Sequence, residues 1–129
     1  MRVLLVEDSV TARRVAEAVL RNEGWQVSTA GDAVTALRLI RELAFDLVLM
    51  DRELPDASGD DVVRALRVSS GPNRFSLVVA LSGTVTVEAI EQCRCAGMLA
   101  LLEKPLKPSA LRGLRRLVQA GRPLTAAGG

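Results

Sequence analysis

Short apolar runs alternate along the chain with longer amphipathic segments. The runs cover residues 2–6, 26–30, 46–50, 77–81 and 99–102. The first, third and fourth are almost continuously apolar, which is typical of strands buried on both faces of a sheet. We therefore predict five strands at these positions.

The segments between the runs predict helices. The first covers about 10–23, and its apolar face is formed by Ala12, Val15, Ala16, Val19 and Leu20. The second begins after Asp32, and its apolar face is formed by Ala33, Ala36, Leu37, Ile40 and Leu43. The last begins at Pro108, and its apolar face is formed by Leu111, Leu114, Leu117 and Val118. Each face follows the spacing of three and four residues that one side of a helix requires.

Two further helices complete the alternation. One ends near Val68, and the next covers about 86–96. Ser9 is a suitable N-cap for the first helix because its hydroxyl can accept a hydrogen bond from a free backbone N–H. Gly24 and Gly97 follow the first and fourth helices, where glycine commonly ends a helix.

Strands that alternate with helices predict a parallel sheet covered on both sides. The expected fold is α/β: a flavodoxin-like, doubly wound sheet of five parallel strands in the order 2-1-3-4-5, with five helices on its two faces. One domain is expected over residues 1–120, followed by a flexible C-terminal tail at 121–129. In this fold the ligand site lies beyond the carboxyl ends of strands 1 and 3, where the winding reverses.

Composition narrows the class of protein. The chain has 129 residues, of which 49% are hydrophobic and 25% charged, a balance typical of one globular domain. No apolar run approaches the roughly 20 residues of a membrane span. The first strand begins too close to Met1 for a signal peptide, so we expect no membrane contact and a cytoplasmic location.

The charge does not indicate nucleic-acid binding. The net charge is only +2, and the chain holds one Trp and two Phe. The basic residues of two predicted helices are expected to form a solvated surface: Arg64, Arg67, Arg112, Arg115 and Arg116.

Histidine is absent from the chain, which excludes histidine-based catalysis and a role as phosphohistidine carrier. Cys93 and Cys95 are the only cysteines. Positions two apart do not share a helix face, and no other thiol or imidazole could complete a zinc site. We expect at least one of these cysteines to be a small buried side chain.

Acidic residues follow the two strands that flank the winding reversal. Glu7 and Asp8 come directly after the first strand, and Asp51 comes directly after the third. Three carboxylates that lie close together repel one another unless a proton or a cation neutralises them. Any one of them, Asp8 above all, could instead be a helix cap or a solvated turn residue, but a set of three oxygen donors without histidine or thiolate favours Mg²⁺.

Further polar groups follow the remaining strands. Ser82 and Gly83 come after the fourth strand, and Lys104 comes before Pro105 after the fifth. A carboxylate such as Asp51 can attack phosphorus and form an acyl phosphate. Lys104 would add a point charge, Ser82 a hydroxyl and Gly83 a backbone N–H, and phosphoryl transfer requires this kind of positioning and charge neutralisation.

Four motifs resemble those of the response-regulator receiver domains of two-component signalling. They are VEDS at 6–9, MDRELPDASG at 50–59, LSG at 81–83 and EKP at 103–105, and the resemblance covers about residues 2–118. It implies that Asp51 is the phosphoacceptor, that Asp8 and Asp51 bind Mg²⁺ directly, and that Glu7 does so through water. The main-chain carbonyl of Glu53 would complete the metal site.

The same resemblance implies further properties. Ser82, Gly83 and Lys104 would bind the phosphoryl group, and the Lys104–Pro105 peptide would be cis. Such a domain is not an enzyme beyond catalysing its own phosphorylation and slow dephosphorylation. It takes phosphate from a sensor histidine kinase, on another chain or in the same polypeptide, or exchanges it with a histidine phosphotransfer domain. The output is expected at the face of helix 4, strand 5 and helix 5, from a monomer or weak homodimer.

Two positions depart from the family pattern, and others are expected to modulate the site. Family members usually carry Tyr or Phe three residues before the lysine, where this chain has Leu101. Leu101 indicates either a different output mechanism or a plain core residue. Glu53, two residues after the acceptor, could overhang the site and alter access of hydrolytic water. Thr84 and Pro105 are the other modulatory candidates.

Residues 91–98 (EQCRCAGM) resemble the stretch E-x-C-x-x-A-G-M that is common in receivers fused to hybrid sensor kinases. The chain would then be such a receiver or a stand-alone regulator of that lineage. Two alternatives remain open. A phosphatase of the haloacid dehalogenase type also uses an aspartate nucleophile with Mg²⁺, and Glu53 could imitate its second acid. A pseudo-receiver would keep the fold as a docking module without taking phosphate.

Overall fold

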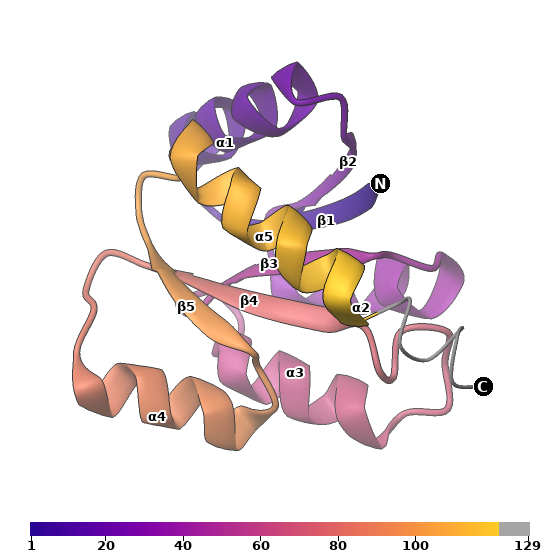
Figure 1. Ribbon diagram of the computed structural model, residues 1–129. Helices are drawn as coiled ribbons and strands as arrows, with labels where there is room; N and C mark the ends of the chain where they lie inside the picture. Colours follow the sequence, from indigo (N-terminus) through magenta and orange to yellow (C-terminus); the bar gives the residue numbers. More distant parts are fainter. Residues whose placement is uncertain (122–129) are drawn as a thin grey trace.

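The structure, a computed structural model, describes residues 1–121 (Figure 1). Strands and helices alternate along this whole length. The strands are β1 (Arg2–Val6), β2 (Gln26–Ala30), β3 (Leu47–Asp51), β4 (Leu77–Ser82) and β5 (Ala100–Glu103). The helices are α1 (Val10–Asn22), α2 (Ala33–Glu42), α3 (Gly59–Val68), α4 (Val87–Ala96) and α5 (Pro108–Gly121).

The five strands form one parallel sheet in the order β2-β1-β3-β4-β5. Helices α1 and α5 cover one face, and α2, α3 and α4 cover the other (Figure 1). Alternate residues of each strand point to opposite faces, so Val3 and Leu5 pack under α1 and α5 while Leu4 and Val6 pack under α2 and α3. The predicted fold class and strand order are confirmed.

The predicted helix ends are also observed. The Ser9 hydroxyl accepts a hydrogen bond from the Ala12 N–H, and the Asp32 carboxylate accepts one from the Thr35 N–H. Gly24 and Gly97 have φ values of +84° and +100°, a left-handed conformation that glycine adopts without the steric cost of a Cβ.

Some element boundaries and faces differ from the prediction. β3 begins at Leu47 instead of 46, and β5 lies one residue later than predicted. Leu99 therefore stands before β5 and is 45% exposed. Val15 is 49% and Leu117 is 40% exposed, because the faces of α1 and α5 that meet the sheet are narrower than the apolar stripes in the sequence.

The predicted solvated surface is wrong for Arg67. Its Nε and Nη2 donate to the Gly97 carbonyl at 3.1 and 2.7 Å, and its Nη1 donates to the carbonyls of Arg74 and Ser76. Burial lowers the pKa of the Arg67 guanidinium. Three carbonyls of the α3–β4 and α4–β5 turns thus hold this side chain, and the periodicity of α3 alone gives no sign of them.

Cys93 is buried and Cys95 is exposed, as expected for at least one of the pair. The predicted tail begins at the last residue of α5, and positions 122–129 lie outside the described residues. No helix within residues 1–121 combines the length and apolar character needed to cross a bilayer.

Candidate functional site

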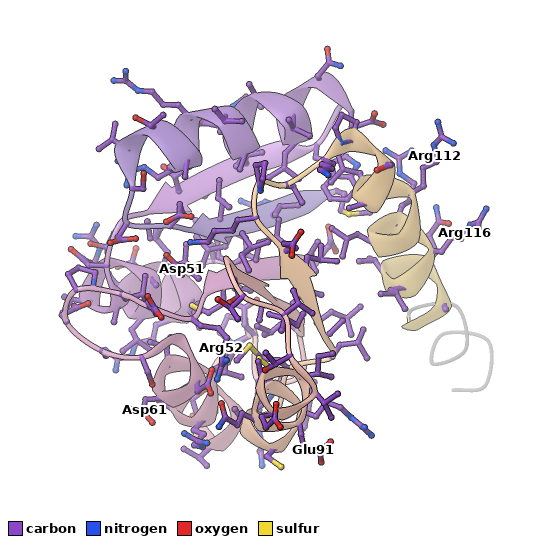
Figure 2. The ribbon with its side chains drawn as sticks, turned by 90° about the vertical axis from the view of Figure 1, so that its left-hand side faces the viewer. Asp51, Arg52, Asp61, Glu91, Arg112 and Arg116 are labelled. Atoms are coloured by element: carbon purple, nitrogen blue, oxygen red, sulfur yellow. The ribbon has the colours of Figure 1, made fainter. Side chains whose placement is uncertain are left out.

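The parallel sheet brings the carboxyl ends of β1 and β3 together at one edge. Figure 2 looks onto this edge and shows Asp51 between α1 above the sheet and α3 below it. Carboxylate oxygens of Glu7, Asp8 and Asp51 lie within 4.8 Å of one another. Glu7 and Asp51 are each 2% exposed, whereas Asp8 is exposed. Within residues 1–121 this is the only group of three or more potential metal ligands that meet so closely.

Lys104, directly after β5, reaches the same carboxylates. Its Nζ lies 2.8 Å from Glu7 Oε1 and 3.1 Å from Asp51 Oδ2. Its backbone N–H donates to the Ser82 carbonyl, which fixes the lysine to the end of β4. One ammonium therefore neutralises part of the charge of three carboxyl groups.

The electrostatics of the site follow from burial and crowding. Burial, together with the neighbouring Glu7 carboxyl, raises the pKa of Asp51 to about 7, against the opposing effects of the Glu53 N–H and Lys104. Burial acts to raise the pKa of Asp8 as well, but hydrogen bonds with Asp51 and Glu7 and the charge of Lys104 outweigh it and hold this pKa below its usual value. The pKa of Lys104 is raised: burial opposes the charge, and contacts with Glu7 and Asp51 overcome it.

The loop after β3 holds the Asp51 carboxylate in place. Asp51 Oδ1 accepts a hydrogen bond from the Glu53 N–H at 3.0 Å. The Gly59 N–H donates to the Arg52 carbonyl at 2.8 Å. A Cβ at Gly59 would lie 2.2 Å from the Asp51 carbonyl oxygen, so only glycine allows α3 to start this close to the end of β3.

Ser82, Gly83 and Thr84 lie at the rim of the site. The Ser82 hydroxyl donates to the Thr84 carbonyl at 2.9 Å and accepts from the Thr84 N–H at 3.2 Å. The sequence prediction places this hydroxyl on a phosphoryl oxygen, whereas here it closes its own turn. A Cβ at Gly83 would meet nothing within 4 Å, so the fold itself does not require glycine there.

A pocket of about 350 Å³ opens beside Asp51. It is lined by Asp51, Arg52, Glu53, Ser82, Gly83, Thr84, Thr86, Glu88, Ala89, Gln92 and Lys104. Glu53 and Glu88 bring two further acids to its wall. The pocket thus gives an incoming group access to the buried Asp51 from the α4 side.

Leu101 is half-buried and packs against the apolar cluster under α2, α3 and α4, which agrees with its interpretation as a core residue. The Lys104–Pro105 peptide is cis, as the resemblance implied. Pro105 lines a second pocket, of about 430 Å³, between α1 and the loop that joins β5 to α5.

The sequence prediction missed several polar contacts of the loop after β3. The Asp56 carboxylate accepts hydrogen bonds from the N–H groups of Ala33 and Val34 at 2.8 and 3.1 Å, at the N-terminus of α2. Arg52 forms a paired contact with Asp60. An acid at a helix N-terminus is a favourable arrangement. The Asp56 contact could not be predicted, however, because Asp56 lies 23 residues from Ala33 in the sequence.

The donor set fits a hard divalent cation. All three carboxylates offer oxygen, and Mg²⁺ prefers an octahedron of oxygen ligands, several of them water. Asp51 Oδ2 is buried and faces Lys104 Nζ without forming a hydrogen bond of good geometry, so this oxygen retains a lone pair for a cation. The exposed Asp8 leaves one side of the cluster open to water.

Comparisons with known proteins agree with this geometry. The family model of the response regulator receiver domain matches residues 3–115. The sensor histidine kinase AruS of Pseudomonas aeruginosa is 36% identical over 113 residues, which are 87% of this chain and 11% of AruS. The DNA-binding response regulator MtrA of Mycobacterium tuberculosis is 37% identical over 110 residues, which are 85% of this chain and 46% of MtrA. The chain therefore spans less than half of either relative.

Solved structures are similar over nearly the whole domain. The chemotaxis protein CheY4 of Vibrio cholerae is 29% identical, with a TM-score of 0.82 over 89% of this chain and 96% of that one. The receiver domain of the sensor histidine kinase PA1611 from Pseudomonas aeruginosa is 33% identical, with a TM-score of 0.78 over 92% of this chain and 94% of that one, and it has a magnesium ion in its active-site cleft. With the acidic cluster, the fold and the matched residues in agreement, this chain belongs to the response regulator receiver domain family of two-component signalling proteins.

Proposed function

We propose that this domain accepts a phosphoryl group on Asp51 from the phosphohistidine of a sensor histidine kinase, with Mg²⁺ bound beside it. The observation that carries the proposal is the contact of a buried acceptor carboxylate with two further acids and with Lys104. A cluster that serves only to stabilise the fold gains nothing from a third carboxylate beside two that are already buried. The three carboxylates together with Lys104 suit a site that must hold a cation and a phosphate side by side.

The residues of the site suit a direct transfer from imidazole to carboxylate. An Asp51 oxygen attacks phosphorus, a new P–O bond forms, and the P–N bond to the donor imidazole breaks with its electron pair returning to nitrogen. The Lys104 ammonium lies 3.1 Å from Asp51 Oδ2, where it can neutralise charge on the transferred group. We propose that the Ser82 hydroxyl and the Gly83 N–H bind phosphoryl oxygens once the group is in place.

The metal site would consist of Asp8, Asp51 and the Glu53 carbonyl, with Glu7 bound through water. When bound, Mg²⁺ supplies positive charge that orients the phosphoryl group and lowers the repulsion between donor and acceptor. Glu7 is already paired with Lys104 at 2.8 Å, which supports an indirect role for its carboxylate. Asp8 is the exposed member and would exchange its water for the cation.

The position in a signalling pathway is also a proposal. AruS is a sensor histidine kinase and MtrA a DNA-binding regulator, so a domain of this kind occurs in both settings. We propose a histidine kinase as phosphate donor, in the same polypeptide or another, and a histidine phosphotransfer domain as an alternative exchange partner. Output would pass by protein contacts at α4, β5 and α5.

The test is incubation with Mg²⁺ and acetyl phosphate, followed by the intact mass of the wild type and of Asp51→Asn. The proposal requires one added phosphoryl group in the wild type and none in the variant. A domain that takes no phosphate, from acetyl phosphate or from a kinase, would be a docking module instead. Continuous release of phosphate from an aryl phosphate over many turnovers would identify a phosphatase.

Mg²⁺ binding is expected to weaken as the pH falls below the pKa of Asp51. This pKa is about 7 without metal, and the protonated carboxyl must lose its proton to become a ligand. The apparent affinity should fall about tenfold for each pH unit below 7 and level off above it. Calorimetric titration across a pH series measures this slope, and Asp51→Asn should flatten it.

The raised pKa of Asp51 also determines in which direction the stability of the fold changes with pH. The folded pKa of Asp51 lies above the unfolded value of 3.8, so the metal-free fold binds a proton that the unfolded chain has released. Its stability should therefore fall as the pH rises from about 4 to about 7. Added Mg²⁺ should stabilise most at the upper end of this range. A thermal-melt gain from Mg²⁺ that is equal at both ends would contradict this assignment.

Glu53→Asn is expected to lengthen the lifetime of the phosphoryl group. Glu53 lines the pocket beside Asp51, where its carboxylate can accept a hydrogen bond from the attacking water. Asparagine is shorter by one methylene and its amide oxygen is an uncharged, weaker acceptor, so dephosphorylation should slow by roughly one order of magnitude. Loss of the added mass over time, after acetyl phosphate is removed, measures the rate. Glu88→Gln, in the same pocket, is the matched control, and an unchanged Glu53→Asn rate would rule out this role.

A further inference from the structure

Arg52, the residue directly after the acceptor, connects three elements of the site. Its Nε and Nη2 donate to the two carboxylate oxygens of Asp60 in α3, at 3.1 and 2.9 Å. Its Nη2 also donates to Gln92 Oε1 in α4, at 2.9 Å. The Arg52 and Asp60 side chains are only 19% and 12% exposed. A paired guanidinium–carboxylate contact in such an environment is geometrically well defined.

The arrangement places Arg52 between the acceptor and α4. Figure 2 shows Arg52 between Asp51 and the two helices below the sheet. Arg52 and Gln92 both line the pocket into which Asp51 opens. A phosphoryl group on Asp51 would enter this pocket and share it with a guanidinium that already holds α4 by a hydrogen bond.

Helix α4 is the helix best suited to respond. Its buried residues are Ala89, Cys93 and Ala96, all small, whereas α3 buries Val62, Val63 and Leu66. The free energy gained by burial grows with apolar area, so α4 is held to the sheet less strongly than α3. A single charged hydrogen bond is then a substantial part of what fixes its position.

We propose that Arg52 is a positioning residue that transmits the phosphorylation state of Asp51 to α4 through its hydrogen bond to Gln92. The inference rests on the proposed phosphorylation of Asp51. A phosphoryl group brings a charge of about −1.5 to −2 at neutral pH. It attracts the guanidinium, Nη2 leaves Gln92 Oε1, and within residues 1–121 α4 keeps only the contact of its C-terminal end with Arg67. This route needs no aromatic side chain at position 101, where the chain has a core-packed leucine.

The test is amide hydrogen exchange of α4, with Mg²⁺ present throughout and with or without acetyl phosphate. In the wild type, loss of the Arg52–Gln92 bond should make the amides of Val87–Ala96 exchange about tenfold faster after phosphorylation. In Gln92→Ala these amides should already exchange fast, and phosphorylation should change them little. Arg52→Lys should behave likewise, because one ammonium cannot hold Asp60 at two points and Gln92 as well.

The matched control is Glu91→Ala, one position earlier on the same helix. Glu91 pairs with Arg94 at 3.6 Å and both side chains are exposed; it does not line the pocket. This variant should keep the full difference between the two states. A purely structural effect of shortening a side chain on α4 would appear in both variants, whereas the proposal requires it in Gln92→Ala alone.

Intact mass, recorded on the same samples, separates this inference from the function on which it rests. A wild type without added phosphate would overturn both. A phosphorylated wild type whose α4 exchange is unchanged or slower would overturn only the role of Arg52. A tenfold difference in α4 exchange between phosphorylated and unphosphorylated Gln92→Ala would also overturn only the role of Arg52. A Gln92→Ala that takes no phosphate would also overturn it, by placing Gln92 in the transfer itself.

Discussion

Asn73→Ala is expected to lower the free energy of unfolding by about 3 kcal/mol. Asn73 is completely buried. Its Oδ1 accepts a hydrogen bond from the Phe45 N–H at 2.7 Å, and its Nδ2 donates to the carbonyls of Ile40 and Leu43. The Ser76 hydroxyl also donates to Oδ1, at 3.0 Å. Alanine would leave these buried backbone groups without partners, which costs far more than the bonds themselves contribute.

Chemical denaturation measures the effect, and a thermal midpoint roughly 10 °C lower should accompany it. Asn73→Asp is a second variant: it keeps the acceptor for Phe45 but sets a carboxylate oxygen against two carbonyls, so it should be at least as unstable at neutral pH. Asn22→Ala, at the exposed end of α1, is the matched control and should change stability by no more than about 0.5 kcal/mol. If Asn73→Ala unfolded at the same denaturant concentration as the wild type, water would be replacing the hydrogen bonds of the Asn73 amide without cost in stability.

Asn73 illustrates which part of the structure the sequence could predict. Periodicity gives the elements, because burial on two sheet faces or one helix face repeats along the chain. Residues 69–73 show only that a turn lies there. The role of Asn73 depends on Ile40, Leu43 and Phe45, which lie about 30 residues away. A polar residue whose partners come from another element leaves no periodic signal, so its burial could not be anticipated.

The candidate site was predictable for a related reason. Residues at the carboxyl ends of neighbouring parallel strands must meet once the strand order is known. Glu7, Asp8, Asp51 and Lys104 were therefore placed together from the alternation of strands and helices alone. The Arg52–Gln92 contact needed the packing of α4 beside α3, and two helices on the same face can pack in more than one way. The prediction that Val15 is buried was wrong for the same reason, since its burial depends on how α1 lies over the sheet.

Lys104→Ala is expected to slow phosphorylation of Asp51 by acetyl phosphate about 100-fold or more. Nζ contacts both Glu7 and Asp51, and within residues 1–121 it is the only cation that forms an ion pair with Asp51. Without Lys104, the negative charge of the phosphoryl group is no longer neutralised by a nearby ammonium during transfer. The substitution also removes the ion pair with Lys104, which holds the pKa of Asp51 down, so less of the acceptor is ionised at neutral pH. The rate of mass gain at fixed acetyl phosphate and Mg²⁺ measures the change.

The pH dependence of that rate distinguishes a chemical role of Lys104 from a structural one. If Lys104 acts on the acceptor, the rate of Lys104→Ala should rise with pH over a higher range than in the wild type, because the pKa of Asp51 is then raised further. A variant that is merely less stable would lose rate without moving the pH profile.

Lys107→Ala changes an exposed lysine three residues later and is the matched control. It should react within about twofold of the wild type, since an isolated surface charge contributes little. Lys104→Arg keeps the charge and should recover part of the rate. A Lys104→Ala rate within twofold of the wild type would show that the two neighbouring acids and the metal suffice without this cation.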